Sequence, residues 1–238
     1  MSLRTFMSAS AREFVDGPAG RIEVAIDEPS SPADEPSSPA DERGSPADEP
    51  ARAARGIALI AHPHPLYGGT LDNKVTQTLA KIFVELGYIA LRPNFRGVGG
   101  TEGEHDHGIG ETDDLVRVAE YARTRSGELS LVLAGFSFGA YVQTRVAKRL
   151  SVERMVLIGV PTGLVAAGRR YEIETVAADT IVIHGEVDET VLLANVLDWA
   201  RPQELPIIVA PGCDHFFHRK LHLIRSIIRG QWHPAARS

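Results

Sequence analysis

The 238-residue sequence predicts an α/β fold, in which helices cover both faces of a mostly parallel β-sheet. Two observations predict this fold class. Segments patterned as strands alternate along the chain with segments patterned as helices, and alternation of this kind favours parallel strands joined by helical crossovers. In addition, several of the strand segments are continuously apolar, which is typical of strands buried on both faces of a sheet.

The predicted strands differ in their apolar patterns. Arg21–Ile26 alternates apolar and polar residues, as a half-buried strand does. Gly56–Ala61 is continuously apolar and is expected inside the sheet. Five more strands are predicted near Tyr88–Arg92, Ser130–Ala134, Arg154–Gly159, Thr180–His184 and Pro206–Ala210.

The predicted helices lie between these strands. The first carries apolar residues at helical spacing from Leu71 to Leu86 and ends at Gly87. Four more are predicted near Glu111–Arg125, Phe138–Leu150, Val191–Ala200 and Phe216–Arg229. Because ligands of open α/β sheets bind outside the carboxyl ends of the strands, we expect the functional residues in the loops at that edge.

A tandem repeat interrupts this pattern before the second strand. Three seven-residue copies share the sequence Ser-Pro-Ala-Asp-Glu, at Ser30–Pro36, Ser37–Arg43 and Gly44–Pro50. Each copy contains a proline, which breaks helices, and only alanine as apolar content. Such a segment cannot offset the entropy lost on ordering its backbone. We therefore predict that residues 27–55 form a disordered acidic insert within a single domain spanning residues 1–238; a docking tail for a basic partner is the alternative.

Charge and composition exclude several classes of protein. The net charge is −6, but residues 27–50 hold eight acids and one arginine, which leaves the rest of the chain at about +1. This balance does not favour a nucleic-acid partner or a polybasic membrane surface. No apolar stretch approaches the roughly 20 residues that span a bilayer, and the N-terminal segment lacks the apolar core of a secretory signal. Together with the single cysteine, Cys213, these features predict a cytoplasmic protein.

The most specific motif is Gly135-Phe-Ser-Phe-Gly139. It directly follows the apolar run Leu131–Ala134 and precedes a predicted helix. Gly-x-Ser-x-Gly between a strand and a helix forms a sharp turn that exposes the serine, and the flanking glycines let strand and helix approach closely. The turn also places Ser137 at a helix N-terminus, where backbone N–H groups favour a developing anion. Ser137 is therefore the predicted nucleophile.

A nucleophilic serine needs a base, and the base needs an orienting carboxylate. Asp188 follows the predicted strand Thr180–His184, and His215 follows the strand Pro206–Ala210. Serine, acid and histidine thus occur in the chain order typical of this fold class. We predict that His215 is the base and Asp188 the orienting carboxylate. The alternatives are Asp214 as the orienting group and Cys213 as a second nucleophile; we interpret Cys213 as a small buried loop residue.

Five segments carry a resemblance to a known family: His62–Gly69 (HPHPLYGG), Asn94–Gly103 (NFRGVGGTEG), Gly135–Gly139, His184–Asp188 (HGEVD) and Asp214–His215. With them the sequence resembles the α/β-hydrolase superfamily, and within it a compact bacterial group of serine hydrolases related to dienelactone hydrolase. The resemblance covers nearly the whole chain except the repeat. It implies an eight-stranded sheet, an acyl-serine intermediate and no cofactor. Dienelactone hydrolase itself uses a cysteine nucleophile, so its substrate is not carried over.

The predicted oxyanion hole combines the backbone N–H of Phe138 with one from the loop His62–Gly69. Because Pro63 and Pro65 have no N–H, the second donor comes from His64, Leu66 or Tyr67, and the prediction chooses Leu66. Tyr67 is the predicted substrate-binding residue. With Leu66, Phe136 and Phe138 it is expected to form an apolar rim; the alternative for Phe136 is a position in the core.

Other residues receive structural interpretations. The nine histidines lack the His-Glu-x-x-His pattern of a metalloprotease helix, so no metal site is predicted. Arg96 is interpreted as an anchor for neighbouring carbonyl or carboxylate groups, with substrate binding as the alternative. Only residues 160–179 are available for a lid, too few for an independent domain.

Taken together, these features predict a lidless serine hydrolase that cleaves esters, thioesters or similar acyl compounds of small to medium size. A noncatalytic binding module that uses the acidic insert is the alternative, and peptidase activity is a weaker one. No nucleic-acid or membrane partner is expected. The sequence does not identify the oligomeric state and leaves a homodimer open.

Overall fold

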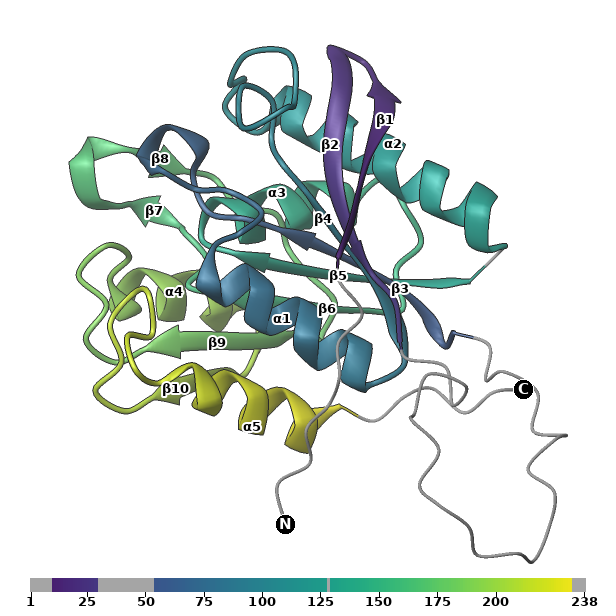
Figure 1. Cartoon of the computed structure of the whole chain (residues 1–238). Helices are drawn as coiled ribbons and strands as arrows, with labels where there is room; N and C mark the ends of the chain where they lie inside the picture. Colours follow the sequence, from purple (N-terminus) through teal and green to yellow (C-terminus); the bar gives the residue numbers. More distant parts are fainter. Residues whose placement is uncertain (1–9, 30–53, 128, 233–238) are drawn as a thin grey trace, which may run out of the picture.

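One sheet organises the residues that the computed structural model describes, which are 10–29, 54–127 and 129–232 (Figure 1). Its eight strands lie in the order β1-β2-β4-β3-β5-β6-β9-β10. The pairs β1–β2 and β2–β4 are antiparallel, and every other pair is parallel. This confirms the predicted eight-stranded, mostly parallel sheet. The strands are β1 (Ala11–Gly17), β2 (Gly20–Asp27), β3 (Gly56–Ala61), β4 (Tyr88–Pro93), β5 (Ser130–Phe136), β6 (Arg154–Ile158), β9 (Ile181–Gly185) and β10 (Ile207–Ala210).

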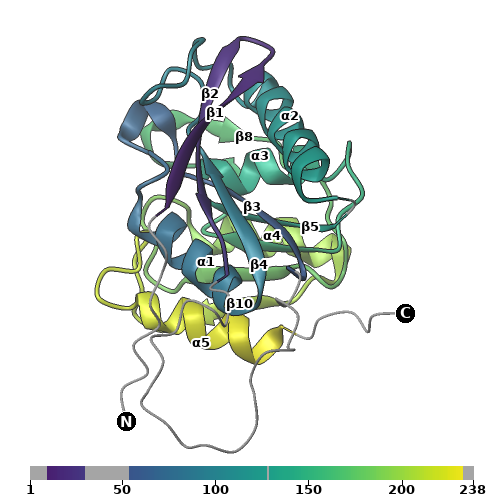
Figure 2. The same ribbon diagram turned by 45° about the vertical axis from the view of Figure 1, so that its right-hand side comes forward.

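Helices cover both faces of this sheet (Figures 1 and 2). The α-helices are α1 (Lys74–Glu85), α2 (Ile109–Ser126), α3 (Phe138–Val146), α4 (Leu193–Ala200) and α5 (Leu221–Gln231). Helices α1 and α5 pack side by side on one face, and α2, α3 and α4 lie on the other. Strand β3 contacts both layers, because Ala58 and Ile60 face α1 while Ile57, Leu59 and Ala61 face α2 and α3. This two-sided burial explains its continuously apolar sequence.

Several element boundaries differ from the prediction. Strand β1 was not predicted, because Val15 is its only buried residue and the edge strand shows no apolar periodicity. Helix α4 begins two residues late because the N–H of Val191 is hydrogen-bonded to Asp188. Helix α5 begins at Leu221 rather than Phe216, since Phe217 and Arg219 have positive φ angles that end one turn and start another. Helix α3 ends at Val146.

Most of the predicted acidic insert lies outside the described residues, but its edges do not. Asp27 is the last residue of β2, and its carboxylate accepts a hydrogen bond of 3.0 Å from Nε of Arg92. Both side chains are almost fully buried, and Arg92 also donates to the carbonyl of Leu71. At the other edge, the N–H of Arg55 donates to the carbonyl of Gly87. The predicted insert boundaries at residues 27 and 55 are therefore too wide, because both residues are tied into the sheet region.

We predict that Asp27→Asn destabilises the fold strongly, because the substitution removes the buried counter-charge of Arg92 and leaves only the half-exposed carboxylate of Asp72, 3.8 Å from Nη1. The free energy of unfolding should fall by about 3–5 kcal/mol, measured by urea denaturation. Asp198→Asn is the matched control, since Asp198 pairs with Arg201 at an exposed surface where such pairs contribute about 1 kcal/mol or less. Equal losses in the two variants would contradict the prediction.

Candidate active site

A strained turn positions Ser137 between β5 and α3. Its φ of 53° and ψ of −123° are rarely adopted by residues with a side chain. A Cβ atom on Gly135 would lie 2.6 Å from the backbone nitrogen of Ala140, and one on Gly139 would lie 2.3 Å from the carbonyl oxygen of Ala61. Both contacts are closer than real atoms allow. The two glycines of the motif are therefore required for the helix to start against the end of β3.

Three loops at the carboxyl edge of the sheet bring Ser137, His215 and Asp188 together. Nε2 of His215 lies 2.9 Å from Oγ of Ser137, and Nδ1 lies 2.7 Å from Oδ2 of Asp188. All three residues are buried. Because an ionised carboxylate can only accept, Nδ1 carries the proton shared with Asp188, and Nε2 is left to accept the serine hydroxyl. The structure thus assembles the three residues that the sequence singled out.

The carboxylate of Asp188 is held by its own loop. Its Oδ1 accepts hydrogen bonds from the N–H groups of Thr190 at 2.9 Å and Val191 at 2.8 Å. The carbonyl of Val191 lies 2.9 Å from Nε2 of His184, a fully buried residue of β9. Burial lowers the pKa of His184, so its imidazole is neutral and donates to that carbonyl. Oδ2 lies 3.5 Å from Nε2 of His184 and makes its shorter contact, 2.7 Å, with Nδ1 of His215.

The two alternative residues near His215, Asp214 and Cys213, do not take the catalytic roles considered for them. The carboxylate of Asp214 accepts from the N–H of His218 at 3.1 Å and lies 2.6 Å from its Nδ1, so it pairs with His218 and not with His215. Cys213 is buried, and burial raises the pKa of its thiol. A protonated thiol is a poor nucleophile. The structure agrees with the interpretation of Cys213 as a buried loop residue and gives Asp214 no orienting role.

The loop after β3 offers a different backbone donor from the one predicted. The N–H of Leu66 donates to Nδ1 of His64 at 3.3 Å, and the N–H of Tyr67 donates to the carbonyl of His64 at 3.1 Å. Within the part of the chain that the structure describes, the N–H groups of His64 and Phe138 have no acceptor. The structure therefore does not support Leu66 as the donor: the turn that begins at Pro65 uses its N–H internally.

His62 joins the loops that follow β3 and β4. Its Nδ1–H donates to the carbonyl of Pro63 at 2.7 Å, and its Nε2 accepts the N–H of Phe95 at 2.9 Å. Only a neutral imidazole can both donate and accept in this way. Complete burial accordingly lowers the pKa of His62 to about 4. This side chain is thus a structural clamp that fixes the loop beside Ser137.

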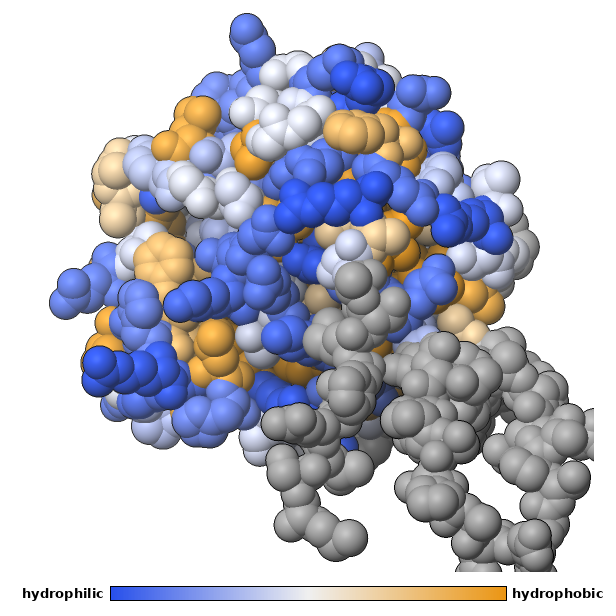
Figure 3. Space-filling view, in the orientation of Figure 1, coloured by the Kyte–Doolittle hydropathy of each residue, from blue (hydrophilic) through white to orange (hydrophobic). Residues whose placement is uncertain are grey.

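The predicted apolar rim is wrong in two of its members. Phe136 and Phe138 are at most 1% exposed, because Phe136 packs into the core beneath His215 and Phe138 beneath His64. Leu66 and Tyr67 are exposed, as expected. Other exposed apolar residues are Ile109 at the start of α2, Leu164 at the end of β7, and Val187, Leu192 and Phe216 in loops. On the face shown in Figure 3, apolar side chains appear at separate places along the left-hand edge with hydrophilic ones between them.

Arg96 contacts groups of α2, in line with its interpretation as an anchor. Arg96 makes a two-pronged contact with the buried carboxylate of Asp114 at 2.8 and 2.9 Å and also donates to the carbonyl of Gly110. It therefore anchors the start of α2. Among residues 10–29, 54–127 and 129–232, no group of three or more histidine, cysteine, aspartate or glutamate side chains is arranged to hold a metal ion.

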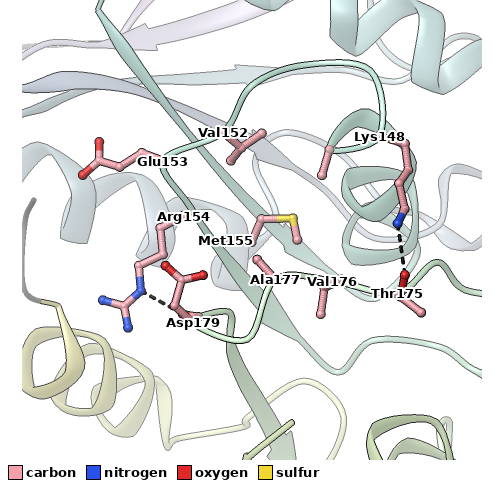
Figure 4. Close-up of a pocket in the computed structure, with 10 residues that line it drawn as sticks. Lys148, Val152, Glu153, Arg154, Met155, Thr175, Val176, Ala177 and Asp179 are labelled. Atoms are coloured by element: carbon pink, nitrogen blue, oxygen red, sulfur yellow. Dashed lines mark hydrogen bonds between the residues drawn. The ribbon is translucent and has the colours of Figure 1, made fainter. Parts of the chain in front are cut away.

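A cavity of about 380 Å³ lies at the opposite edge of the sheet (Figure 4). Its lining comes from the end of α3, the start of β6 and the segment before β9. In it, Nζ of Lys148 donates to Thr175, and Nε of Arg154 donates to the carbonyl of Asp179. These residues sit at the amino ends of their strands, away from Ser137. The cavity is therefore separate from the assembled site.

The segment between β6 and β9 holds no lid domain. It contains one short hairpin, formed by β7 (Gly163–Leu164) and β8 (Arg170–Tyr171). The site is consequently open at the carboxyl edge of the sheet.

No helix of the described residues is long and apolar enough to cross a membrane.

Three known proteins are similar over most of this chain, although no family model matches it. An uncharacterised protein of Rickettsia prowazekii is 31% identical over 219 residues, which cover 87% of this chain and 82% of the relative. An α/β serine hydrolase without a lid from Xanthomonas campestris has a solved structure that is 35% identical, with a TM-score of 0.78 over 98% of this chain and 99% of the other. An α/β serine hydrolase homologue from Coxiella burnetii is 31% identical, with a TM-score of 0.76 over 95% and 99%.

We predict that the stability of the fold falls as the pH drops from about 6.5 toward 4. Above this range His62 is neutral in both states. Within this range His62 becomes protonated in the unfolded state. In the folded state its imidazole, with a pKa of about 4, stays neutral. The free energy of unfolding should lose about 3 kcal/mol from this residue alone. His62→Gln should therefore lower stability at pH 7.5 but flatten its dependence on pH, as measured by urea denaturation across the range.

His222→Gln is the control for this experiment, because His222 is exposed on α5. It should leave the pH dependence of the wild type unchanged. An equal slope in wild type and His62→Gln would show that His62 is not held neutral by burial.

Proposed function

Since this chain belongs to the α/β serine hydrolases that lack a lid, we propose that it cleaves carboxylic esters, thioesters or similarly activated acyl compounds through an acyl-serine intermediate. The observation that carries this proposal is the continuous hydrogen-bonded chain from Oγ of Ser137 through His215 to Asp188. In this series of hydrogen bonds each side chain has the partner that its proposed role requires. A purely structural role would not require all three.

In the proposed reaction, Oγ of Ser137 attacks the substrate carbonyl while Nε2 of His215 takes the hydroxyl proton. Asp188 stabilises the imidazolium that forms. The tetrahedral intermediate collapses, the bond to the leaving group breaks, and His215 gives its proton to the departing oxygen or sulfur. Water then attacks the acyl-serine with His215 again as the base, which releases the carboxylic acid and restores Ser137.

We assign the oxyanion hole to the N–H groups of Phe138 and His64. Phe138 is the first residue of α3, so its N–H lies at the positive end of the helix dipole. His64 follows the end of β3, and its ring packs on that of Phe138 with centroids 4.8 Å apart. Two donors aimed at the developing oxyanion stabilise the transition state, and each contributes about a 100- to 1000-fold rate increase in known cases. His64, and not the predicted Leu66, is the second donor because the N–H of Leu66 already donates to Nδ1 of His64.

The open edge of the sheet favours acyl compounds of small to medium size. With no lid to cover it, the site offers little surface for a long chain. The exposed side chains of Tyr67 and Phe216, whose rings pack against His64 and His215, supply apolar contacts beside the site. We propose Tyr67 as a substrate-binding residue on this ground.

Covalent labelling with a fluorophosphonate probe tests the proposal. Wild-type protein should be labelled, because the probe's phosphorus reacts with an activated serine. Ser137→Ala should abolish labelling by removing the nucleophile, and His215→Ala should abolish it by removing the base. Absence of labelling in a folded wild-type protein would overturn the proposal and favour the noncatalytic binding module.

Substitution of the carboxylates tests the assignment of the orienting group. We predict that Asp188→Asn lowers kcat for a 4-nitrophenyl ester by about 10⁴-fold, because an amide favours the wrong tautomer of His215. Asp214→Asn is the matched control and should stay within a few-fold of the wild type, since Asp214 pairs with His218. A larger loss for Asp214→Asn than for Asp188→Asn would reverse the assignment.

A further inference from the structure

A guanidinium group stands over one wall of the proposed active site. Arg169 lies in the β7–β8 hairpin, which Figure 1 shows at the same edge of the sheet at which β9 ends. The carbon of its guanidinium lies 4.4 Å from the ring centroid of Tyr67. The ring of Tyr67 packs edge-on against His64, and His64 packs on Phe138, the residue after Ser137. Arg169 is thus two side chains away from the oxyanion donors.

The hydrogen bonds of Arg169 leave some N–H groups of its guanidinium without an acceptor. Its Nε donates to the carbonyl of Ala166 at 3.2 Å, and its Nη1 donates to the hydroxyl of Tyr171 at 3.3 Å. Among the described residues, no carboxylate lies within 4.0 Å of its nitrogens, and Nη2 has no hydrogen-bond acceptor. The group is half-buried and held by two aromatic rings. It is therefore an oriented cation whose outer donors remain available.

Three histidines stand beside Arg169 at the same wall. The pKa of His64 is lowered to about 4, first by burial and then by the charges of His105, Arg169 and His107. These groups are therefore close enough to act on one another electrostatically. The ring of His105 lies 4.8 Å from that of His64 and 5.0 Å from that of His107. His64 is neutral near pH 7 and His105 lies 2.8 Å from the carboxylate of Glu111, so Arg169 is the permanent cation of this group and favours a negatively charged group in front of it.

The positions of the acyl and leaving groups decide which part of a substrate reaches Arg169. The leaving group takes its proton from His215, so it must lie on the side of that ring, which packs against Phe136 and Phe216. Arg169 lies over Tyr67, whose ring packs against His64 and not against the rings around His215. The acyl group extends away from the leaving group and hence toward this side.

We propose that Arg169 is a specificity-determining residue that binds a carboxylate at the far end of the acyl group. The preferred substrates are then half-esters or half-thioesters of dicarboxylic acids. The planar fork of a guanidinium matches a carboxylate through two parallel hydrogen bonds. The reaction is the one already proposed, so this inference rests on the serine hydrolase function and adds the charge of its substrate.

A matched pair of esters tests the inference. One is the 4-nitrophenyl half-ester of adipic acid, and the other is 4-nitrophenyl 6-methylheptanoate, which replaces the carboxylate with an uncharged isopropyl group of the same shape. Wild-type protein should prefer the half-ester in kcat/KM. Arg169→Gln should lose about tenfold in kcat/KM on the half-ester, mainly through KM, and should keep the wild-type value on the neutral ester.

Arg170→Gln is the control, because Arg170 is the next residue of the same hairpin and is exposed. It should retain the wild-type preference. Arg169→Lys keeps the charge without the fork and should show an intermediate preference. High salt should reduce the preference of the wild type, since the pair would be partly exposed.

An equal ratio of kcat/KM for the two esters in wild type and Arg169→Gln would overturn the inference. So would equal losses on both esters, which would mean that Arg169 only supports Tyr67 and the hairpin. Failure of the serine hydrolase function is distinguishable from either result, because wild-type protein would then hydrolyse neither ester and would not react with the fluorophosphonate probe.

Discussion

The close approach of α3 to the end of β3 is the constraint on which the site depends. Because Gly139 has no side chain, the helix begins in contact with Ala61, and the turn before it forces Ser137 into a strained conformation. The N–H of Ser137 donates to the carbonyl of Ile158 at 2.9 Å, so the turn is also tied to β6. This geometry presents Oγ at the edge of the sheet, beside the N-terminus of α3, where the partial positive charge of the helix is available.

Neutral buried histidines support this arrangement from both sides. His62 fixes the loop after β3 through one donated and one accepted hydrogen bond, and His184 holds the carbonyl of Val191 in the loop that carries Asp188. Burial lowers the pKa of each. Each imidazole therefore costs the fold stability in acid, while at neutral pH it keeps a backbone segment in place.

Sequence patterns located much of the fold and the three residues that the structure brings together. Strand β3 was recognisable because it is buried on both sides, and Ser137, Asp188 and His215 because each follows a strand in the expected order. Strand β1 escaped because an antiparallel edge strand buries too little to leave a pattern. The boundary at Asp27 escaped for another reason: its acidic side chain resembled the insert, while Arg92, which neutralises it, lies 65 residues away.

By itself, the sequence determined the alternation of strands and helices, the glycine-flanked serine turn and the chain order of the site residues, because these depend on local sterics and periodicity. Tertiary structure decided which groups are available to react. It engaged the N–H of Leu66 with His64, buried Phe136 and Phe138 under the site, paired Asp214 with His218, and set Arg169 over Tyr67. The burial of Phe136 and Phe138 and the contact of Arg169 with Tyr67 depend on packing between segments far apart in the sequence, so no single segment contains them. The bonds of Leu66 and Asp214 are local, but they form in turns that no apolar periodicity marks.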